Sequence, residues 1–190
     1  MEKMNLNDCL NGELISLRSL NVNLAEIMYE YVREDRNRLS KFLPWVSNIN
    51  SVKDEIAFID KSIENWNNLE GFTFGIFDLI NGCYMGNISV FRLDWKNESC
   101  EIGYWILGKF EGKGYIRDSI KTLEKELFSV GFNRIIIECE PGNARSRKIP
   151  VSLSYRYEGT LRACKKFHEK FVDIEVHSKL KSDYIFNTNN

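Results

Sequence analysis

A run of glycines and lysines at residues 108–120, GKFEGKGYIRDSI, has the composition of a phosphate-binding turn. Gly112 and Gly114 allow positive φ, so that successive backbone N–H groups can converge on one anion. The residues after the turn read as a helix, and a helix N-terminus adds positive potential at the same place. Lys109 and Lys113 add two charges. The stretch predicts a pyrophosphate site, although a strand-to-helix turn tightened by glycines reads equally well from these letters alone.

Two common phosphate motifs do not fit this turn. A Walker loop requires GxxxxGK[ST], but Gly108 and Gly112 are one residue too close, and Gly114 follows Lys113 in place of serine or threonine. The dinucleotide fingerprint requires GxGxxG, and Arg117 stands where the third glycine belongs. The strands before the turn also read as an antiparallel meander, which neither motif uses.

The hydrophobic periodicity predicts seven strands and four main helices around this turn. Alternating residues indicate strands at 13–20, 72–79, 83–93, 99–107, 134–140, 155–161 and 171–180, with a hairpin at Asn81-Gly82. Helical spacing indicates helices at 23–34, 51–68, 116–130 and 143–153, with a short helical turn at 38–46. The second helix begins with the capping pattern SVKD and carries a stripe of Ile56, Ile59, Ile63 and Trp66. The tail from residue 181 is expected to be loose.

Bulk composition limits the classes of function. The 190 residues suit one domain, and 43% hydrophobic with 28% charged residues is ordinary for a globular protein. A net charge of -1 gives no sign of a nucleic-acid partner, and no segment is long and apolar enough to span a membrane. The five cysteines are scattered, no Cys or His falls at metal-ligand spacing, and the N-terminus lacks a signal-peptide core. We expect a cytoplasmic protein without a metal.

Six segments are informative when they are taken in series. They are KFEGKG (109–114), FLPWV (42–46), EIGYWIL (101–107), GFNRIIIEC (131–139), GNARSRKIPVSLSYRYEGTLR (142–162) and VDIEVHSKLKSDY (172–184). Together they resemble the GNAT superfamily of N-acetyltransferases, and within it the Rim-type N-acetyltransferases of ribosomal-protein serine and alanine termini. The turn KFEGKG fits the acetyl-CoA signature Q/R-x-x-G-x-G/A of that superfamily, with Lys109 at its first position. The chain departs from the pattern at Lys109, and at Ser154, where the family has a glycine in left-handed conformation.

The resemblance implies an α/β (α+β) fold: a mixed, strongly bent sheet of about seven strands with splayed central strands, flanked by about four helices. It implies a single domain over residues 1–190, with a flexible tail from about residue 181. Acetyl-CoA would lie in the splay and serve as co-substrate. The residues expected to hold it are Trp105, Ile106 and Leu107 at the strand edge, Lys109, Gly112, Lys113, Gly114 and Tyr115 at the turn, and Asn143 before the short helix.

The resemblance also implies direct attack of an amine on the thioester in a ternary complex. Pro150 stands where many members have the tyrosine that protonates the leaving thiolate, and Ser146 matches the serine proposed instead in one Rim-like subgroup. For the base, Lys165 replaces one subgroup's glutamate, so Glu138 is our first choice and Glu101 our second. His168 in a hairpin loop is a weaker candidate, and ordered water alone is another.

These roles have plainer alternatives. Ser146 could be an ordinary first-turn residue, Asn143 a simple N-cap, and Glu138 a surface carboxylate paired with a lysine.

The acceptor would enter opposite the cofactor, between Phe42, Trp45 and Tyr104. The last hairpin is basic at Arg162, Lys165, Lys166 and Lys170, which would suit an acidic ribosomal protein. The predicted function is acetylation of a protein N-terminal amine. The alternatives are a small amine such as a polyamine or aminoglycoside, a non-catalytic CoA-binding module, and a nucleotide-binding protein. A homodimer through sheet edges would be in keeping with the superfamily.

Overall fold

The computed structural model describes residues 1–167 and 169–188, which build one mixed sheet with helices on both faces. Its strands run in the order β1-β2-β3-β4-β5-β6-β8-β7. They are β1 (Cys9–Asn11), β2 (Ile15–Ser19), β3 (Phe72–Asp78), β4 (Tyr84–Asp94), β5 (Ser99–Ile106), β6 (Arg134–Cys139), β7 (Arg156–Phe167) and β8 (Lys170–Leu180). The helices are α1 (Ala25–Glu34), α2 (Arg36–Leu39), α3 (Val52–Asn67), α4 (Tyr115–Ser129), α5 (Ala144–Ser152) and α6 (Lys181–Thr188), with 3-10 turns η1 (Val22–Leu24), η2 (Pro44–Asn48) and η3 (Gly108–Phe110). The predicted mixed, bent sheet is confirmed.

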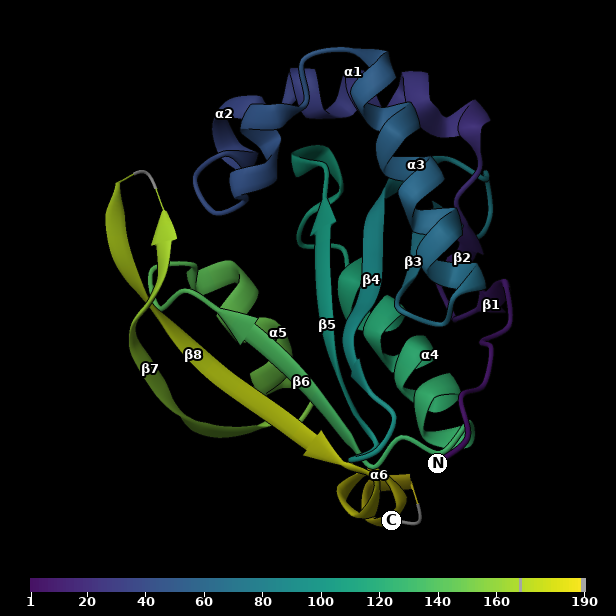
Figure 1. The fold of residues 1–190 in the computed structure, drawn as a ribbon, viewed down its shortest axis with the longest axis vertical. Helices are drawn as coiled ribbons and strands as arrows, with labels where there is room; N and C mark the ends of the chain where they lie inside the picture. Colours follow the sequence, from purple (N-terminus) through teal and green to yellow (C-terminus); the bar gives the residue numbers. More distant parts are fainter. Residues whose placement is uncertain (168, 189–190) are drawn as a thin grey trace.

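The sheet opens into a V between its two central strands. Strands β5 and β6 are parallel and pair over only three residues of each, from Ser99 opposite Arg134 to Glu101 opposite Ile136. Beyond Glu101 they separate, and Figure 1 shows β1–β5 in one arm and β6, β8 and β7 in the other. The splay predicted from the resemblance is therefore present. It leaves the upper half of β5 with a backbone edge that no strand covers.

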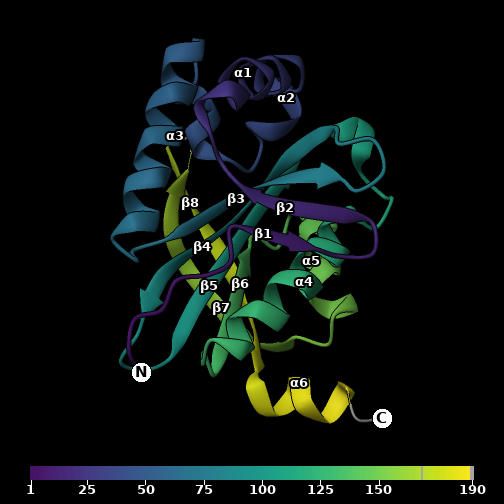
Figure 2. The ribbon, with the colours of Figure 1, turned by 90° about the vertical axis from the view of Figure 1, so that its right-hand side faces the viewer.

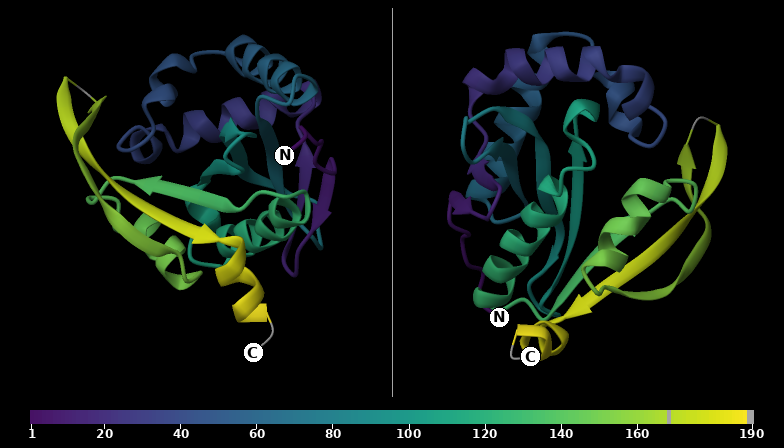
Figure 3. Two further views of the ribbon diagram at one scale, coloured as in Figure 1. Left: turned by 60° about the horizontal axis from the view of Figure 1, so that its bottom comes forward. Right: turned by 180° about the vertical axis from the view of Figure 1, so that it is seen from behind.

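Different helices cover the two faces of the first arm. Ile116, Ile120, Leu123 and Leu127 of α4 are buried against the sheet, as their spacing predicts. Helices α1 and α3 pack on the opposite face through Met28 and Ile59, and Figure 2 shows α3 and α4 on either side of this arm. Seen from behind, α4 and α5 lie on the same side of the V, one on each arm (Figure 3). The V is thus bordered by α4 and α5 behind and by α1–α3 in front.

A buried ion pair joins the two arms at the closed end of the V. The Nζ atom of Lys179 on β8 lies 3.0 and 2.9 Å from the carboxylate oxygens of Glu124 on α4. The two side chains are 6% and 2% exposed, and the Lys179 ammonium lies 4.8 Å from the centre of the Tyr155 ring. Burial raises the pKa of Glu124, and Lys179 opposes that rise. The charged pair therefore fixes α4 against the second arm.

Three elements differ from the sequence-based predictions. Strand β1 has only three residues, too few for an alternation to be recognised. Strand β7 continues to Phe167 because Lys165, Lys166 and Phe167 still pair with β8. The segment expected to be a loose tail forms α6. The predicted capping box is present: the Asp54 carboxylate accepts from the Ser51 N–H at 2.8 Å.

The backbone at Ser154, just after α5, is left-handed with φ +61. Glycine takes this conformation without strain, whereas a Cβ makes it cost about 1 kcal/mol. We expect Ser154→Gly to raise the free energy of unfolding by up to about 1 kcal/mol, offset in part by glycine's greater entropy in the unfolded chain. Urea unfolding of the two proteins measures this. A lower stability of the glycine variant would contradict the strain assigned to Ser154.

Candidate active site

Six consecutive backbone N–H groups at the start of α4 are free of protein acceptors. Within the described chain, the N–H groups from Gly112 to Arg117 have no hydrogen-bond partner, and the first intrahelical bond runs from Asp118 N to Gly114 O at 2.9 Å. Gly112 and Gly114 have φ of +74 and +85, as predicted. A Cβ on Gly112 would have no heavy atom within 4 Å. The turn therefore offers an open row of donors of the kind that cradles a diphosphate.

The two lysines of the turn have different surroundings. The Lys109 ammonium lies 4.6 Å from the centre of the Tyr31 ring on α1 and 4.0 Å from the Glu34 carboxylate. It is therefore directed toward α1, although the sequence prediction assigns it to the diphosphate. The Lys113 ammonium lies 5.8 Å from the centre of the Phe110 ring. Lys113 lies within the row of free N–H groups, so it is the lysine of the two that is better placed to meet a diphosphate.

The register of β4 and β5 decides which groups face the splay. Leu107 N donates to Met85 O at 3.0 Å, and Ile106 lies opposite Gly86. Because hydrogen-bonded and non-hydrogen-bonded pairs alternate in an antiparallel ladder, Tyr104 and Ile106 point their N–H and C=O groups away from β4. The sequence prediction names Trp105, Ile106 and Leu107 together. Of these three, only Ile106 has its N–H directed toward the open edge in this register. The Tyr104 N–H is directed the same way.

The end of β5 is held by charged residues of the first two helices. Arg38 donates to Ile106 O at 2.6 Å and to Glu111 at 2.6 Å, and it is ion-paired with Asp35. The Asp35 carboxylate also accepts from Gly108 N at 2.8 Å. Glu111 pairs in turn with Arg145 of α5. These contacts tie the turn to both arms. Because the Ile106 carbonyl oxygen is already hydrogen-bonded, Ile106 offers only its N–H group to a ligand in the splay.

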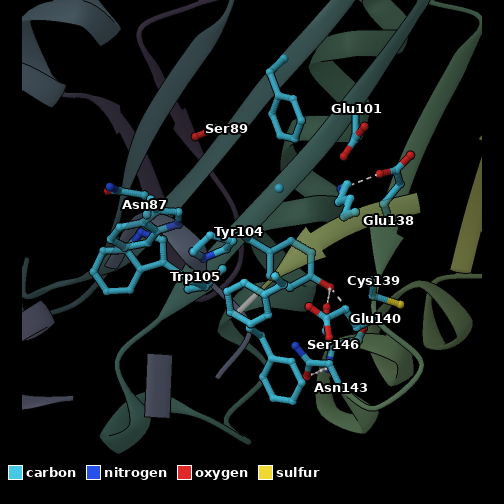
Figure 4. Close-up of a pocket in the computed structure, with 18 of the residues that line it drawn as sticks. Asn87, Ser89, Glu101, Tyr104, Trp105, Glu138, Cys139, Glu140, Asn143 and Ser146 are labelled. Carbon is cyan, nitrogen blue, oxygen red and sulfur yellow. Dashed lines mark hydrogen bonds and ion pairs between the residues drawn. The ribbon is translucent and has the colours of Figure 1, made fainter. Parts of the chain in front are cut away.

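A cavity of about 750 Å³ fills the V in front of β5 and β6. Its walls come from β4, β5, the end of β6, η2, α3, α5 and the outer part of the β7–β8 hairpin. Figure 4 shows Asn87 and Trp105 toward one end of this cavity, Glu101 and Glu138 toward the other, and Tyr104 between them. Phe42 and Trp45 line it as well, with the Trp45 and Trp105 ring centres 5.8 Å apart. All three residues predicted for the acceptor side, Phe42, Trp45 and Tyr104, therefore line the cavity.

Ser146 meets a tyrosine across the splay. The Tyr104 hydroxyl lies 3.2 Å from Ser146 Oγ and donates to Ser146 O at 3.2 Å (Figure 4). Burial raises the pKa of Tyr104, so that it stays protonated. Asn143 caps α5, its Oδ1 accepting from Ser146 N at 3.2 Å, and it also lines the cavity. Tyr104, predicted for the acceptor, thus reaches the hydroxyl predicted to protonate the thiolate.

The two carboxylates predicted as bases are ion-paired. Arg92 Nη1 lies 2.7 Å from Glu101 Oε2 and 3.3 Å from Glu138 Oε1. Lys165 Nζ lies 2.9 Å from Glu138 Oε2. Burial, then the nearby Glu138 charge, raises the pKa of Glu101, and Arg92 opposes the rise. Lys165 therefore pairs with Glu138, as the plainer alternative for that residue has it, although the Glu138 side chain is only 11% exposed and not at the surface.

Glu55 and Asn87 are cavity residues that the sequence analysis missed. Glu55 on α3 is 2% exposed, and its Oε1 has no hydrogen-bond partner among the described residues. Asn87 on β4 is 3% exposed, and its Nδ2 is likewise unpartnered. Burial raises the pKa of Glu55 to about 7, and the neighbouring Asp54 charge adds to the rise. One signal was available: Glu55 is four residues before the buried Ile59, on the inner stripe of the helix.

The remaining predictions concern His168, metal ligands and membrane-spanning segments. His168 lies outside the described residues. One cluster of possible metal ligands occurs in the described chain, where atoms of Cys139, Glu175 and His177 lie within 4.8 Å of one another. Arg147 Nε is 2.9 Å from Glu175, so the carboxylate already has a cationic partner, which favours an ion pair over a metal site. None of the described helices has the length and apolar character needed to cross a membrane.

Comparisons with known proteins agree with this geometry. The acetyltransferase (GNAT) domain model matches residues 15–155. "Putative ribosomal N-acetyltransferase YdaF" of Bacillus subtilis is 31% identical over 181 residues, covering 93% of this chain and 96% of that protein. "Ribosomal-protein-serine acetyltransferase" of Escherichia coli is 21% identical over 170 residues, 89% of this chain and 94% of that protein. The microcin self-immunity acetyltransferase MccE, solved with acetyl-CoA and AMP, matches with a TM-score of 0.85 and 24% identity over 88% of this chain and 93% of that one. The chain therefore belongs to the GNAT family and is an N-acetyltransferase of that type.

Proposed function

We propose that this protein transfers the acetyl group of acetyl-CoA to a primary amine by direct attack in a ternary complex, and that the amine is a protein N-terminus. The observation that carries the proposal is the row of six free N–H groups from Gly112 to Arg117 beside an uncovered strand edge. A diphosphate matches the row, and the amides of a pantetheine chain match the edge. The MccE structure with acetyl-CoA supports this choice of cofactor.

The chain's own groups account for the remaining requirements of the reaction. Acetyl-CoA supplies the acetyl group as a thioester. The Ile106 N–H faces the splay and is placed to donate to the charge that develops on a carbonyl oxygen. The hydroxyls of Ser146 and Tyr104 lie 3.2 Å apart across the splay and can deliver a proton to a leaving thiolate. The acceptor then enters through the cavity in front of β5.

The acceptor proposal rests on the relatives' names and on charge. Relatives are named as acetyltransferases of ribosomal proteins. Part of the basic hairpin is internally paired, Lys165 with Glu138 and Lys166 with Glu169. Arg162 and Lys170 are exposed, and they support attraction of an acidic partner. All five cysteines are free thiols, which supports a reducing compartment such as the cytoplasm.

Calorimetry and acetyl transfer together test the proposal. We expect acetyl-CoA to bind and ATP not to bind. We also expect thiol release from acetyl-CoA to depend on an added peptide with an N-terminal serine more than on spermidine or an aminoglycoside. Faster transfer to spermidine or to the aminoglycoside would contradict a protein N-terminus as the acceptor. Binding without transfer to any amine would contradict the transfer reaction.

Replacing Ser146 by alanine is expected to lower kcat by at least about tenfold, because a proton donor to the thiolate is lost. The dissociation constant for CoA should stay within about twofold, since the change leaves the N–H row intact. Steady-state kinetics and calorimetry measure the two effects. Ser152→Ala is the control, since Ser152 lies on the same helix and is exposed, and its hydroxyl bonds only Ile149 O among the described residues. Equal kcat in the Ser146 and Ser152 variants would remove Ser146 from the mechanism.

A further inference from the structure

One end of the cavity presents polar atoms that the protein does not satisfy. Glu55 Oε1 and Asn87 Nδ2 are both buried and unpartnered in the described chain, and both residues line the cavity. The two residues are linked through Tyr84, which interacts with both. The Tyr84 hydroxyl donates to Asn87 Oδ1 at 2.8 Å, and the Glu55 charge contributes to raising the pKa of Tyr84. A hydrogen-bond acceptor and a donor therefore face the same space without protein partners.

The carboxylates at the other end are already neutralised. Arg92 and Lys165 pair with Glu101 and Glu138, whereas no described cation lies within ion-pair distance of Glu55. A buried carboxylate without a cation or hydrogen-bond donor is costly, and proteins seldom keep one without a use. A ligand that brings a positive charge would supply what Glu55 lacks.

Position along the strand also favours Glu55. Glu101 precedes Ile106 by five residues on β5, which is about 16 Å at 3.3 Å per residue. Arg92 bridges Glu138 to Glu101, so Glu138 lies at that same depth. Asn87 is instead directly opposite Trp105, the neighbour of Ile106. The unpartnered end of the cavity is therefore level with the N–H group assigned to the reacting carbonyl.

The walls beside this end are largely apolar. Phe42, Pro44 and Trp45 line the cavity from η2 and the segment before it, and Phe58 lines it one turn along α3 from Glu55. Apolar walls exclude water and strengthen the attraction between an ammonium group and a lone carboxylate. They also suit a side chain carried next to the amine. A polycation with no apolar body would match them poorly.

Resting on the proposed acetyl transfer, we propose that Glu55 receives the acceptor's ammonium group and takes its proton, while Asn87 Nδ2 donates to the carbonyl oxygen next to that amine. An α-amino group followed by a peptide carbonyl has this pairing of donor and acceptor, and spermidine does not. The substrate class at this site is therefore the N-terminal residue of a peptide.

One ammonium proton passes to the Glu55 carboxylate, and the freed nitrogen lone pair forms the N–C bond to the acetyl carbon. The C–S bond breaks with its electron pair on sulfur. The nitrogen's second proton passes through the hydroxyls of Tyr104 and Ser146 to the thiolate, so that the amide and the thiol both leave uncharged. Glu55 then returns its proton to solvent.

The ionisation of Glu55 fits this role. Its pKa is raised to about 7, so the carboxylate can hold a proton near neutral pH and release it. The titratable groups that face it are Asp54 on its own helix and Tyr84 on β4, with Tyr31 of α1 acting on Tyr84. Burial raises the pKa of both tyrosines, so that neither brings a charge to Glu55 near neutral pH.

The test compares Glu55→Gln with wild type, using acetyl-CoA and a short peptide with an N-terminal serine. At pH 7.5 we expect kcat/KM to fall by about 100-fold or more, within the range for loss of a general base. At pH 9.5 the loss should shrink to below about tenfold, because an α-amino group with a pKa near 8 is then already neutral. The wild-type enzyme should prefer this peptide to spermidine. If Glu55 had a purely structural role, the substitution would lower kcat/KM by the same factor at pH 7.5 and at pH 9.5.

Two further measurements keep the outcomes separate. Glu64→Gln makes the same change on an exposed residue of α3 and should leave kcat/KM within about twofold. The CoA dissociation constant of the Glu55 variant should match wild type. Unchanged kcat/KM in Glu55→Gln at pH 7.5, or a loss equal at both pH values, would overturn the assignment while acetyl transfer stands. Spermidine as the better substrate would overturn the role of Asn87, and a wild-type protein that transfers to neither amine would overturn both proposals.

Discussion

The Glu55→Gln protein is expected to be more stable than wild type at pH 8, by about 3 kcal/mol in the free energy of unfolding. Glu55 is 2% exposed, and its pKa is raised from 4.5 to about 7 in the folded protein. The difference of about 2.5 pH units, at 1.36 kcal/mol per unit, is the cost of ionising the buried carboxyl. Glutamine keeps the shape of the protonated acid and carries no charge. A substitution expected to reduce activity should therefore stabilise the fold.

The sign of the pH dependence follows from proton uptake. Between pH 4.5 and about 7 the folded protein binds more protons at Glu55 than the unfolded chain does, so wild-type stability falls as pH rises through this window. Urea unfolding at pH 5 and pH 8 measures it. We expect the variant's advantage to be under about 1 kcal/mol at pH 5 and about 3 kcal/mol at pH 8. The exposed control, Glu64→Gln, should show no such dependence, and an advantage equal at both pH values would contradict the burial cost.

Replacing Gly112 by valine is expected to weaken CoA binding by about 100-fold. The residue has φ +74 and a Cβ there meets no protein atom, so the protein itself does not fill that side of the turn. A branched side chain would stand among the N–H groups and push the backbone from its left-handed conformation. Losing one or two hydrogen bonds to a charged group costs about 3 kcal/mol, which corresponds to about 100-fold. Isothermal titration with CoA measures the change.

Gly82 provides a matched control for this variant. It lies in the β3–β4 hairpin with φ +70, and a Cβ on it would also have no heavy atom within 4 Å. Gly82→Val should therefore lose similar stability, about 1–2 kcal/mol from backbone strain, and keep its CoA affinity. If both valine variants bind CoA as wild type does, the turn is not the diphosphate site. If both lose affinity alike, the effect is general destabilisation.

Local chemistry made much of the fold predictable from the sequence. Alternation located most of the strands, Asn81-Gly82 located a hairpin, and the glycines of the turn have the positive φ that their spacing predicts. Strand β1 could not be predicted because three residues do not define a period. The end of β7 could not be predicted either, because it depends on pairing with β8 across the hairpin and not on an apolar alternation of its own.

The candidate site was most predictable where it is built from backbone, and several cavity-lining side chains were expected as well. The N–H row follows from glycine spacing, and the open strand edge was expected from the family resemblance. Side-chain roles depend on tertiary pairing, which one sequence does not reveal. Glu138 and Lys165 are 27 residues apart and meet in the cavity, and Tyr104 reaches Ser146 from 42 residues away. Glu55 was missed because the predicted apolar stripe of Ile56, Ile59, Ile63 and Trp66 leaves it out, whereas the buried residues of α3 are Glu55, Ile59 and Ser62.

The attachment of the two arms at the closed end of the V has a mechanical consequence. Strand pairing between β5 and β6 stops at Glu101, and the Glu124–Lys179 pair lies on the same closed side. A rotation of a few degrees about this joint moves the tip of the β7–β8 hairpin through the longest arc and disturbs the joint least. The bond from Tyr104 to Ser146 and the ion pair of Glu111 with Arg145 join the arms farther out and oppose such a rotation, so that the angle between the arms is fixed at both ends.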